Sequence, residues 1–356
     1  MTTKSLLIFR FIFFLLFIQC SSATNKPSIE ANKNSEYYDE WAGLSSASKN
    51  LKHNQNMDLS WGQMLVRRNE ISKFLQNNKY EVNQKTVVYP FSGIDVLNLF
   101  TFFPKSDRYV LFGLEDPGYP FDWEIKNHKE KNVILEGIEN LSSHLAGRNY
   151  FTYRKMKEET KKPELSGAYP VFVAFLRRLG KEIIDTKSEM INGQVNSYYG
   201  FTIVMYDPIL QKNQSLTYYK IFLTGKEGIP GDGLYEYFSN LGEKAIFTKS
   251  AEYLFHGERR STFRNLLLKD TKEIVQDDSG FPLRLFPDTD WTKTLYGKYD
   301  KSWNLSGAVE PESQSEMKLL NERFKNEPLP FPFGYGVLGS KDVSKSVILV
   351  IKKKTN

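Results

Sequence analysis

Residues 86–120 read TVVYPFSGIDVLNLFTFFPKSDRYVLFGLEDPGYP, and this stretch decides the fold class. Residues 86–89 are β-branched or aromatic and are followed by Pro90, which predicts a short buried strand. Residues 95–103 carry apolar side chains at nearly helical spacing, and residues 109–114 form a second apolar run. Strand, turn, helix and strand in this order predict a βαβ unit with two parallel strands and a right-handed crossover.

A second stretch, residues 246–282, repeats the order of these parts. An apolar run is followed by a polar turn, a helical region and a further strand-like run. The two stretches end in EDPGYP at residues 115–120 and in DDSGFP at residues 277–282. Internal duplication of an α/β unit would produce this repeat, and so would the chance recurrence of a Gly-Pro turn after a strand.

The rest of the chain supplies further helices and strands. Helices are expected over 58–76, 133–145, 149–157, 169–179 and 316–324, and strands over 198–206, 215–224 and 346–351. A short polar segment joins the first two of these strands, which favours an antiparallel hairpin. The sequence therefore predicts an α/β fold with a mixed sheet and flanking helices, and internal duplication would relate two βαβ halves by a pseudo-twofold axis. The aromatic segment 286–303 is expected to be irregular, and the lysines at 352–354 to end an edge strand.

The N-terminus has the features of a secretory signal followed by a lipid-attachment site. Lys4 and Arg10 precede the apolar run 11–18, which is shorter than the roughly 20 residues that a membrane-spanning helix needs. Cys20 follows Leu-Phe-Ile-Gln, and this segment resembles the relaxed lipobox of spirochaete lipoproteins. The resemblance implies cleavage after residue 19 and acylation of Cys20, for example with palmitate. Cleavage nearby with loss of Cys20 is the alternative.

These features divide the chain into three predicted parts. Residues 1–19 are a signal peptide, residues 20–57 a lipidated flexible tether, and residues 58–356 a single globular α/β domain. The tether is predicted from its many Ser, Asn, Lys and Ala residues and its few large apolar ones. Cys20 is the only cysteine in the sequence, so the domain has to be stabilised by its core without a disulfide.

Charge and composition argue against several classes of function. The sequence has 48 Lys and Arg residues against 42 Asp and Glu residues, and the basic residues form no concentrated stripe. Nucleic-acid binding is therefore not expected. Four scattered histidines and one N-terminal cysteine offer no zinc-ligand spacing. The glycine-rich loop 225–233 lacks both phosphate-binding fingerprints and is expected to be a surface turn. The sequence therefore predicts neither a metal nor a cofactor.

Four acidic residues follow the predicted parallel strands, where ligands of such sheets usually bind. Glu115 and Asp116 follow the second strand, and Asp277 and Asp278 occupy the corresponding place in the second stretch. If both pairs reach one cleft, they could act as paired carboxylates on a glycan or hold a divalent cation. A separation within about 10 Å between Glu115 and Asp277 would support this site. Acids at such places also form turns and helix caps without any catalytic role.

Two further residues are candidates for hydrolytic chemistry. Ser92 lies in the turn after the first strand, and His256 lies in the second stretch, but the chain has no GxSxG motif. The predicted catalytic set is therefore Glu115, Asp277, Asp278, His256 and Ser92. Glu115 also stands where the ribose-binding acid stands in dinucleotide and S-adenosylmethionine folds, but the preceding turn, PFSGID, has a single glycine.

The blocks YPFSG, GLE, DDSGFP and PFGYG resemble an uncharacterised family of exported bacterial proteins, over residues 86–336. This resemblance implies export and a shared fold, and it supplies no activity. We therefore expect an exported cell-envelope protein that contacts the membrane through its lipid and whose soluble domain binds an unidentified ligand or partner. An envelope hydrolase that uses the acidic cleft is the second hypothesis, and a structural or adhesive surface lipoprotein is the third.

Overall fold

The protein is represented by a computed structural model, which describes residues 35–46, 50–81, 84–118, 128–148, 158–160, 167–222, 224–251, 254–299, 311–334 and 346–355. The strands are β1 (Thr86–Pro90), β2 (Arg108–Gly113), β3 (Glu182–Ile191), β4 (Tyr198–Asp207), β5 (Lys212–Lys220), β6 (Lys244–Thr248), β7 (Thr271–Gln276), β8 (Trp291–Gly297) and β9 (Val347–Lys353). The helices include α1 (Ser35–Trp41), α2 (Leu51–Asn77), α3 (Val96–Phe102), α4 (His128–Arg148), α6 (Tyr169–Arg178), α7 (Gly233–Leu241), α8 (Ser261–Leu268) and α9 (Pro311–Phe324).

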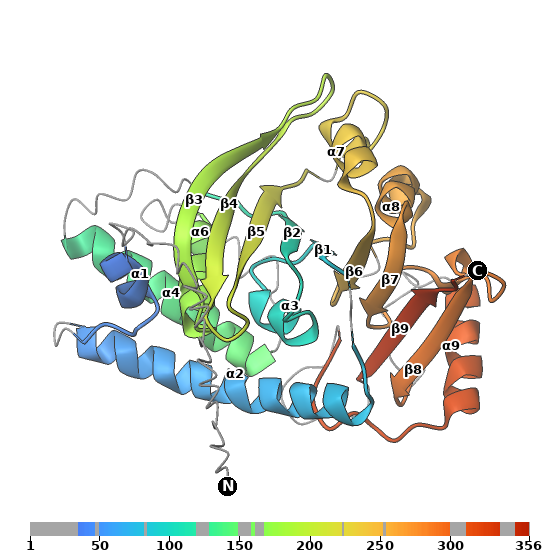
Figure 1. Ribbon diagram of the computed structural model, residues 1–356, viewed down its shortest axis with the longest axis horizontal. Helices are drawn as coiled ribbons and strands as arrows, with labels where there is room; N and C mark the ends of the chain where they lie inside the picture. The colour runs from blue at the N-terminus through green and yellow to red at the C-terminus, as the bar shows by residue number, and fades with distance from the viewer. Residues whose placement is uncertain are drawn as a thin grey trace, which may run out of the picture. The chain divides into compact units, whose positions relative to one another are not determined.

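The strands form one mixed sheet of nine strands in the described part of the chain (Figure 1). Their order is β3-β4-β5-β2-β1-β6-β7-β9-β8. The five strands from β5 to β7 run parallel to one another. Antiparallel pairs extend the sheet on both sides, with β3 and β4 next to β5 and with β9 and β8 next to β7. The predicted α/β class with a mixed sheet is confirmed.

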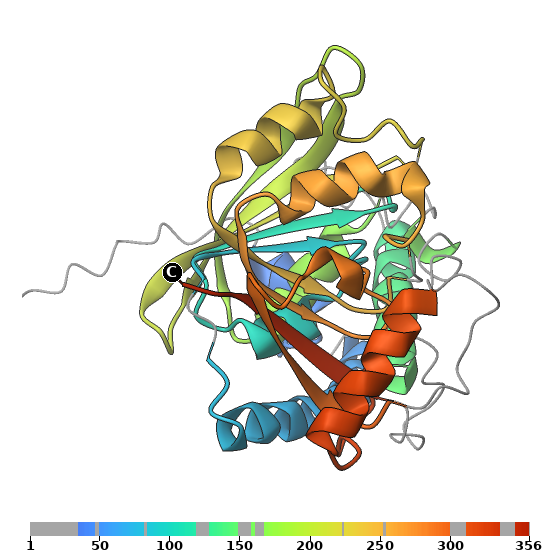
Figure 2. The same ribbon diagram turned by 90° about the vertical axis from the view of Figure 1, so that its right-hand side faces the viewer.

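Each face of the sheet carries its own helices and its own hydrophobic core. Successive residues of β1 point to opposite faces, so Val87 and Tyr89 belong to one core and Val88 to the other. The Val87 face is covered by α1, α2, α3, α4 and α6, and the Val88 face by α7, α8 and α9. Figure 2 shows α7 and α8 above the central strands and α2 and α3 below them. Burial on both faces explains why the central strands read as continuous apolar runs.

Both predicted βαβ units are present, and they are arranged about the neighbouring strands β1 and β6. β1 continues through α3 into β2, whereas β6 continues through α8 into β7 on the other side. Right-handed crossovers that leave in opposite directions reach opposite faces, as α3 and α8 do. Phe91 and Ser250, in the turns after β1 and β6, share a left-handed φ of 56°. The two units therefore leave the neighbouring strands β1 and β6 in opposite directions, and a pseudo-twofold axis between them stays a prediction.

Several predicted elements are confirmed with shifted boundaries. The helices expected over 133–145 and 169–179 correspond to α4 and α6, and the expected hairpin corresponds to β4 and β5. The helix expected over 149–157 lies outside the described residues. None of the helices in the described part of the chain is long and apolar enough to cross a membrane.

The prediction of a flexible tether through residue 57 is wrong for its second half. Residues 35–57 contain α1 and the start of α2, and Tyr38, Trp41 and Met57 are buried in the core. The Trp41 ring meets the Tyr169 ring of α6 edge-on, with 6.3 Å between the ring centroids. A few large side chains thus fasten a segment whose average composition is that of a tether. The signal peptide, Cys20 and residues 21–34 lie outside the described residues.

The two margins of the sheet also differ from the prediction. Residues 291–297 were expected to be irregular, but they form β8. β3 was not predicted, because charged and apolar residues do not alternate regularly along it. β9 was expected at an edge but lies between β7 and β8. Lys352 therefore belongs to an interior strand, where its ammonium group lies 3.1 Å from the Glu273 carboxylate.

Candidate functional site

The carboxyl ends of β1 and β6 form the switch point of the sheet, because the chain leaves these neighbouring strands in opposite directions. In open α/β sheets, ligands usually bind in the crevice outside such a point. The turns at this edge are residues 91–95 after β1, 114–118 after β2, 249–251 after β6 and 277–282 after β7. They contain the candidate residues Ser92, Glu115, Asp277 and Asp278.

Ser92 and Asp95 form hydrogen bonds that stabilise the turn after β1. The Ser92 N–H donates to the Phe112 carbonyl at 3.0 Å, and the Ser92 hydroxyl donates to the Gly93 carbonyl at 2.8 Å. Asp95 caps α3 and accepts from the Asn98 N–H at 3.1 Å. It also accepts from the Tyr89 hydroxyl at 3.1 Å. Ser92 and Asp95 are both buried; Asp95 links β1 to α3, and the Ser92 N–H links the turn to β2.

Asp277 joins the turn after β7 to the turn after β6. It is 0% exposed, and it accepts from the Ser250 N–H at 2.8 Å, the Ser279 N–H at 3.0 Å and the Ser279 hydroxyl at 2.6 Å. The Ala251 N–H in turn donates to the Ser279 hydroxyl oxygen at 2.9 Å. Burial raises the pKa of Asp277, and the hydrogen bonds from Ser279 and Ser250 and the charge of Lys249 oppose this rise. Asp278 is only half-buried.

Lys249 adds a buried cation to the same place. It is 2% exposed, and its ammonium group lies 5.6 Å from the centroid of the Phe333 ring. Burial lowers the pKa of Lys249 to about 8, although the charges of Asp95 and Asp277 favour the protonated form. The positive charge of Arg67 on α2 lowers this pKa further. Two carboxylates and two cations therefore influence one another beneath the switch point.

Two hydroxyl groups at the end of β6 are not satisfied by the protein. The side-chain oxygens of Thr248 and Ser250 are buried, and neither forms a hydrogen bond within the described part of the chain. Ser250 also holds its left-handed φ of 56° without being glycine. Orphaned buried hydroxyls and a strained backbone are both features that concentrate at binding and catalytic sites. The sequence offered only one signal for this feature, a serine in the turn directly after a strand.

Glu115 and Asp116 lie near the ends of β2 and β5 and have different surroundings. Glu115 is buried and accepts from the Tyr218 hydroxyl and from the Leu114 N–H, both at 3.1 Å. Burial raises the pKa of Glu115, and the hydrogen bonds from the backbone and from Tyr218 oppose this rise. Asp116 is half-buried and forms an ion pair with Lys220 at 3.0 Å.

The geometry does not favour a shared site for the two acidic turns. β2 and β7 are separated by β1 and β6, so three strand spacings of about 4.8 Å place their ends roughly 14 Å apart. Glu115 binds Tyr218 on β5, whereas Asp277 binds the turn after β6. A pair of carboxylates acting on one substrate would need a separation of no more than about 10 Å. His256 is buried in the turn before α8, and its catalytic role, like that of the other candidates, stays a prediction.

No family model and no curated protein sequence matches this chain. Among the described residues, His, Cys, Asp and Glu side chains form no group of three or more that could hold a metal ion. What the site can do therefore follows from its own groups. Two buried hydroxyls lie at the switch point, that of Thr248 on β6 and that of Ser250 in the turn after it, and Asp116 and Lys220 provide charges of both signs at the end of β2 and β5.

Proposed function

We propose that this protein is an exported, lipid-anchored cell-envelope protein whose α/β domain binds a small polar ligand at the switch point between β1 and β6. The observation that carries the ligand site is the pair of unsatisfied hydroxyls of Thr248 and Ser250. A buried polar group without a partner costs about 1–3 kcal/mol, and a ligand that bonds to it recovers this energy on binding. The place of these hydroxyls, at the carboxyl ends of the central parallel strands, supports the same conclusion.

The ligand class with the most support contains a ribose or a similar diol. An acid after the second strand accepts ribose hydroxyls in nucleotide-binding sheets of this kind, and Glu115 occupies that place. Its carboxylate retains acceptor capacity beside its bonds to Tyr218 and Leu114. Glu115 matches that acid in position, whereas the turn after β1 lacks the usual glycine pattern. The acidic-cleft hydrolase has less support, since Glu115 and Asp277 lie on strands that are not neighbours.

Thermal denaturation with a ligand panel tests the binding site. The panel contains S-adenosylmethionine, NAD, ATP and ribose 5-phosphate, each added to the wild type and to the variant Thr248→Val/Ser250→Ala. We expect at least one compound to raise the melting temperature of the wild type, because a ligand at 100 times its Kd stabilises by about 2.7 kcal/mol. Without ligand, the double variant should be at least as stable as the wild type. With ligand, its melting temperature should not rise. A full rise in the variant would place binding elsewhere.

Lipid anchoring needs a separate experiment, because Cys20 lies outside the described residues. The chain is expressed in a bacterium that carries a lipoprotein-processing pathway, and the cells are fed an alkyne-labelled palmitate. We expect label and membrane fractionation for the wild type, and neither for Cys20→Ser. Label that persists in Cys20→Ser, or its absence from the wild type, would refute the anchor and leave the ligand site untouched.

A further inference from the structure

A cavity of about 670 Å³ lies at the opposite edge of the sheet, near the amino ends of β1 and β2. It is lined by the last turn of α2, by the turn at 79–81, by the end of α3 and by the loop at 104–105. Its volume falls within the range of about 300–1,000 Å³ that is typical of small-molecule sites. Nothing at the switch point contributes to it, so it is independent of the function proposed above.

One wall of this cavity is held in place by a buried polar contact. The Tyr80 hydroxyl donates to the Glu273 carboxylate at 2.8 Å, and Lys352 pairs with the same carboxylate at 3.1 Å. The Lys352 ammonium group also lies 5.1 Å from the centroid of the Tyr80 ring. Burial and the charge of Glu273 raise the pKa of Tyr80 well above its usual value, so the hydroxyl remains a donor. This wall is therefore fixed before any ligand arrives.

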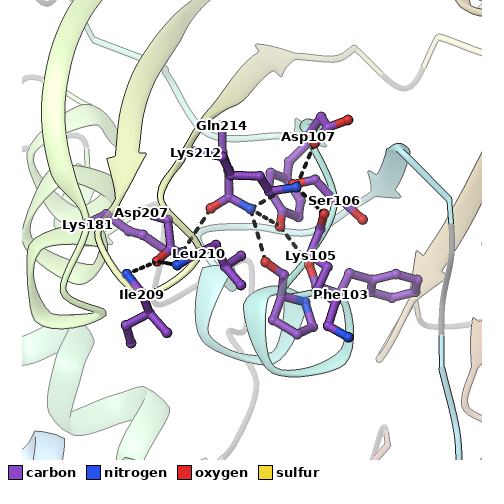
Figure 3. Close-up of polar contacts among 12 residues, drawn as sticks. Phe103, Lys105, Ser106, Asp107, Lys181, Asp207, Ile209, Leu210, Lys212 and Gln214 are labelled. Atoms are coloured by element: carbon purple, nitrogen blue, oxygen red, sulfur yellow. Dashed lines mark hydrogen bonds and ion pairs between the residues drawn. The ribbon is translucent and has the colours of Figure 1, made fainter. Parts of the chain in front are cut away.

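The opposite wall is fixed by the network drawn in Figure 3. The Gln214 amide nitrogen donates to the Pro104 carbonyl at 3.0 Å and to the Ser106 carbonyl at 2.7 Å. The Lys212 ammonium group donates to the Lys105 carbonyl. Lys181 in turn donates to the Gln214 amide oxygen at 2.9 Å, which orients the amide. Preorganised walls of this kind reduce the cost of ordering a site on binding.

The chemistry of the lining combines an apolar floor with a cationic rim. Leu75 and Phe102 are buried apolar side chains, whereas Lys79 and Lys105 are exposed. Neither lysine forms an ion pair within the described part of the chain, and Glu81 is the only acid in the lining. Both lysines follow the C-terminal ends of helices, where a cation also opposes the helix dipole. The rim nevertheless carries one uncompensated positive charge.

We propose that this cavity binds a small amphipathic anion, with an aromatic or medium-chain apolar body and one carboxylate, sulfonate or phosphate group. The apolar body lies on Leu75 and Phe102, and the anionic group lies between Lys79 and Lys105. Charge and shape together determine this choice, because a cation would meet the two ammonium groups and a fully polar ligand would leave the floor unused.

The fluorescent probe 8-anilinonaphthalene-1-sulfonate has this chemistry and tests the proposal on the folded protein. We expect saturable binding to the wild type and a loss of affinity of at least tenfold in Lys79→Asn/Lys105→Gln. Asparagine suits position 79 because Lys79 has a left-handed φ of 49°. Ser72→Trp, which fills the cavity from α2 without changing its charge, should abolish the same binding phase. Lys73→Gln on α2 removes an exposed lysine outside the lining and serves as the matched control.

Competition distinguishes the anion site from general hydrophobic adsorption. Octanoate should displace the probe from the wild type, whereas octylammonium should displace it at least tenfold less effectively. Equal affinity of the probe for the wild type and the lysine double variant would overturn the proposal. Equal displacement by the two octyl compounds would overturn it as well. Circular dichroism of each variant establishes that a loss of binding does not arise from unfolding.

Discussion

Asp277 accepts hydrogen bonds from two turns, and these bonds predict a structural role that stability measurements can test. In Asp277→Asn, an amide nitrogen replaces one of the two oxygens that accept from Ser250 and Ser279. We expect a loss of about 2–4 kcal/mol in the free energy of unfolding, because buried N–H donors are left facing a donor. Urea denaturation measures this loss. The half-buried neighbour provides the control, since Asp278→Asn should cost less than about 1 kcal/mol, and equal losses would contradict the assigned role.

Lys249 makes stability depend on alkaline pH. Its pKa of about 8 in the folded protein lies below its usual value of 10.5, so between these values the unfolded chain binds more protons than the folded chain. Stability from this group therefore increases as the pH rises from 8, by at most about 1.4 kcal/mol per pH unit. We expect Lys249→Met to reduce the slope of stability against pH between 8 and 9.5. Burial also lowers the pKa of Lys244 to about 8, so part of the slope should remain. An unchanged slope would show that Lys249 is protonated normally.

For single residues, the sequence predicted their places relative to the strands better than it predicted the contacts of their side chains. The helix after the first strand was predicted from local apolar spacing, and in the structure Asp95 caps this helix. Ser92 and Asp277 were correctly placed after strands, but their hydrogen bonds connect them to their own turns and to Ser250. The unsatisfied hydroxyl of Thr248 could not be predicted, because it depends on which side chains from distant segments surround it.

Among the structural elements, the β4–β5 hairpin is tied to the end of α6 and to the start of β2 by one buried network (Figure 3). Lys181 forms an ion pair with Asp207, and Asp207 accepts from the Ile209 N–H at 2.9 Å and the Leu210 N–H at 3.0 Å. Burial lowers the pKa of Lys181. Burial alone would raise the pKa of Asp207, but Lys181 and the two N–H groups lower it below its usual value. The network thus joins three segments that are distant in sequence.

Removing both halves of this pair should cost less than the sum of the losses caused by removing each half alone. Asp207→Asn leaves the Lys181 charge buried without its carboxylate, and we expect a loss of about 3–5 kcal/mol. Lys181→Met/Asp207→Asn should be destabilised by at least about 1 kcal/mol less than the sum of the single variants. Denaturation at pH 7 of the four proteins measures this coupling, and additive losses would show that the ion pair is dispensable. Because its pKa is lowered, the contribution of Asp207 should be complete above about pH 4 and disappear in stronger acid.

Element type was predictable where the hydrophobic pattern was strong. β1, β2, α3 and α6 have continuous or helical apolar spacing, and all were found. β3 and β8 were not predicted from the sequence, because their strand partners, rather than their own sequences, determine their conformation. β3 lies at an edge, where charged residues replace apolar ones, and a register shift at 183–185 disturbs its pattern further.

At the scale of the whole molecule, the position of α1 and α2 defines the shortest stable domain. A chain that begins at residue 35 retains Tyr38, Trp41 and Met57 and should unfold within about 2 °C of a chain that begins at residue 20. A chain that begins at residue 58 loses these buried side chains, and removal of one large core side chain alone costs about 3–5 kcal/mol. We expect this shorter chain to melt at least 10 °C lower or to aggregate. Equal melting temperatures in a calorimeter would show that the domain begins later than the structure indicates.

The placement of β9 between β7 and β8 has a consequence for biosynthesis. β9 is the only strand that pairs with β8 in the described part of the chain. Because β9 is a segment that is translated some fifty residues after β8, β8 cannot join the sheet until β9 has been made. Until that segment emerges, β7 also presents an unpaired side, and an exposed strand edge is open to wrong partners. Completion of the sheet is thereby delayed until synthesis has passed residue 353. If the chain is exported as proposed, such a delay would help to keep it unfolded for passage through a secretion channel.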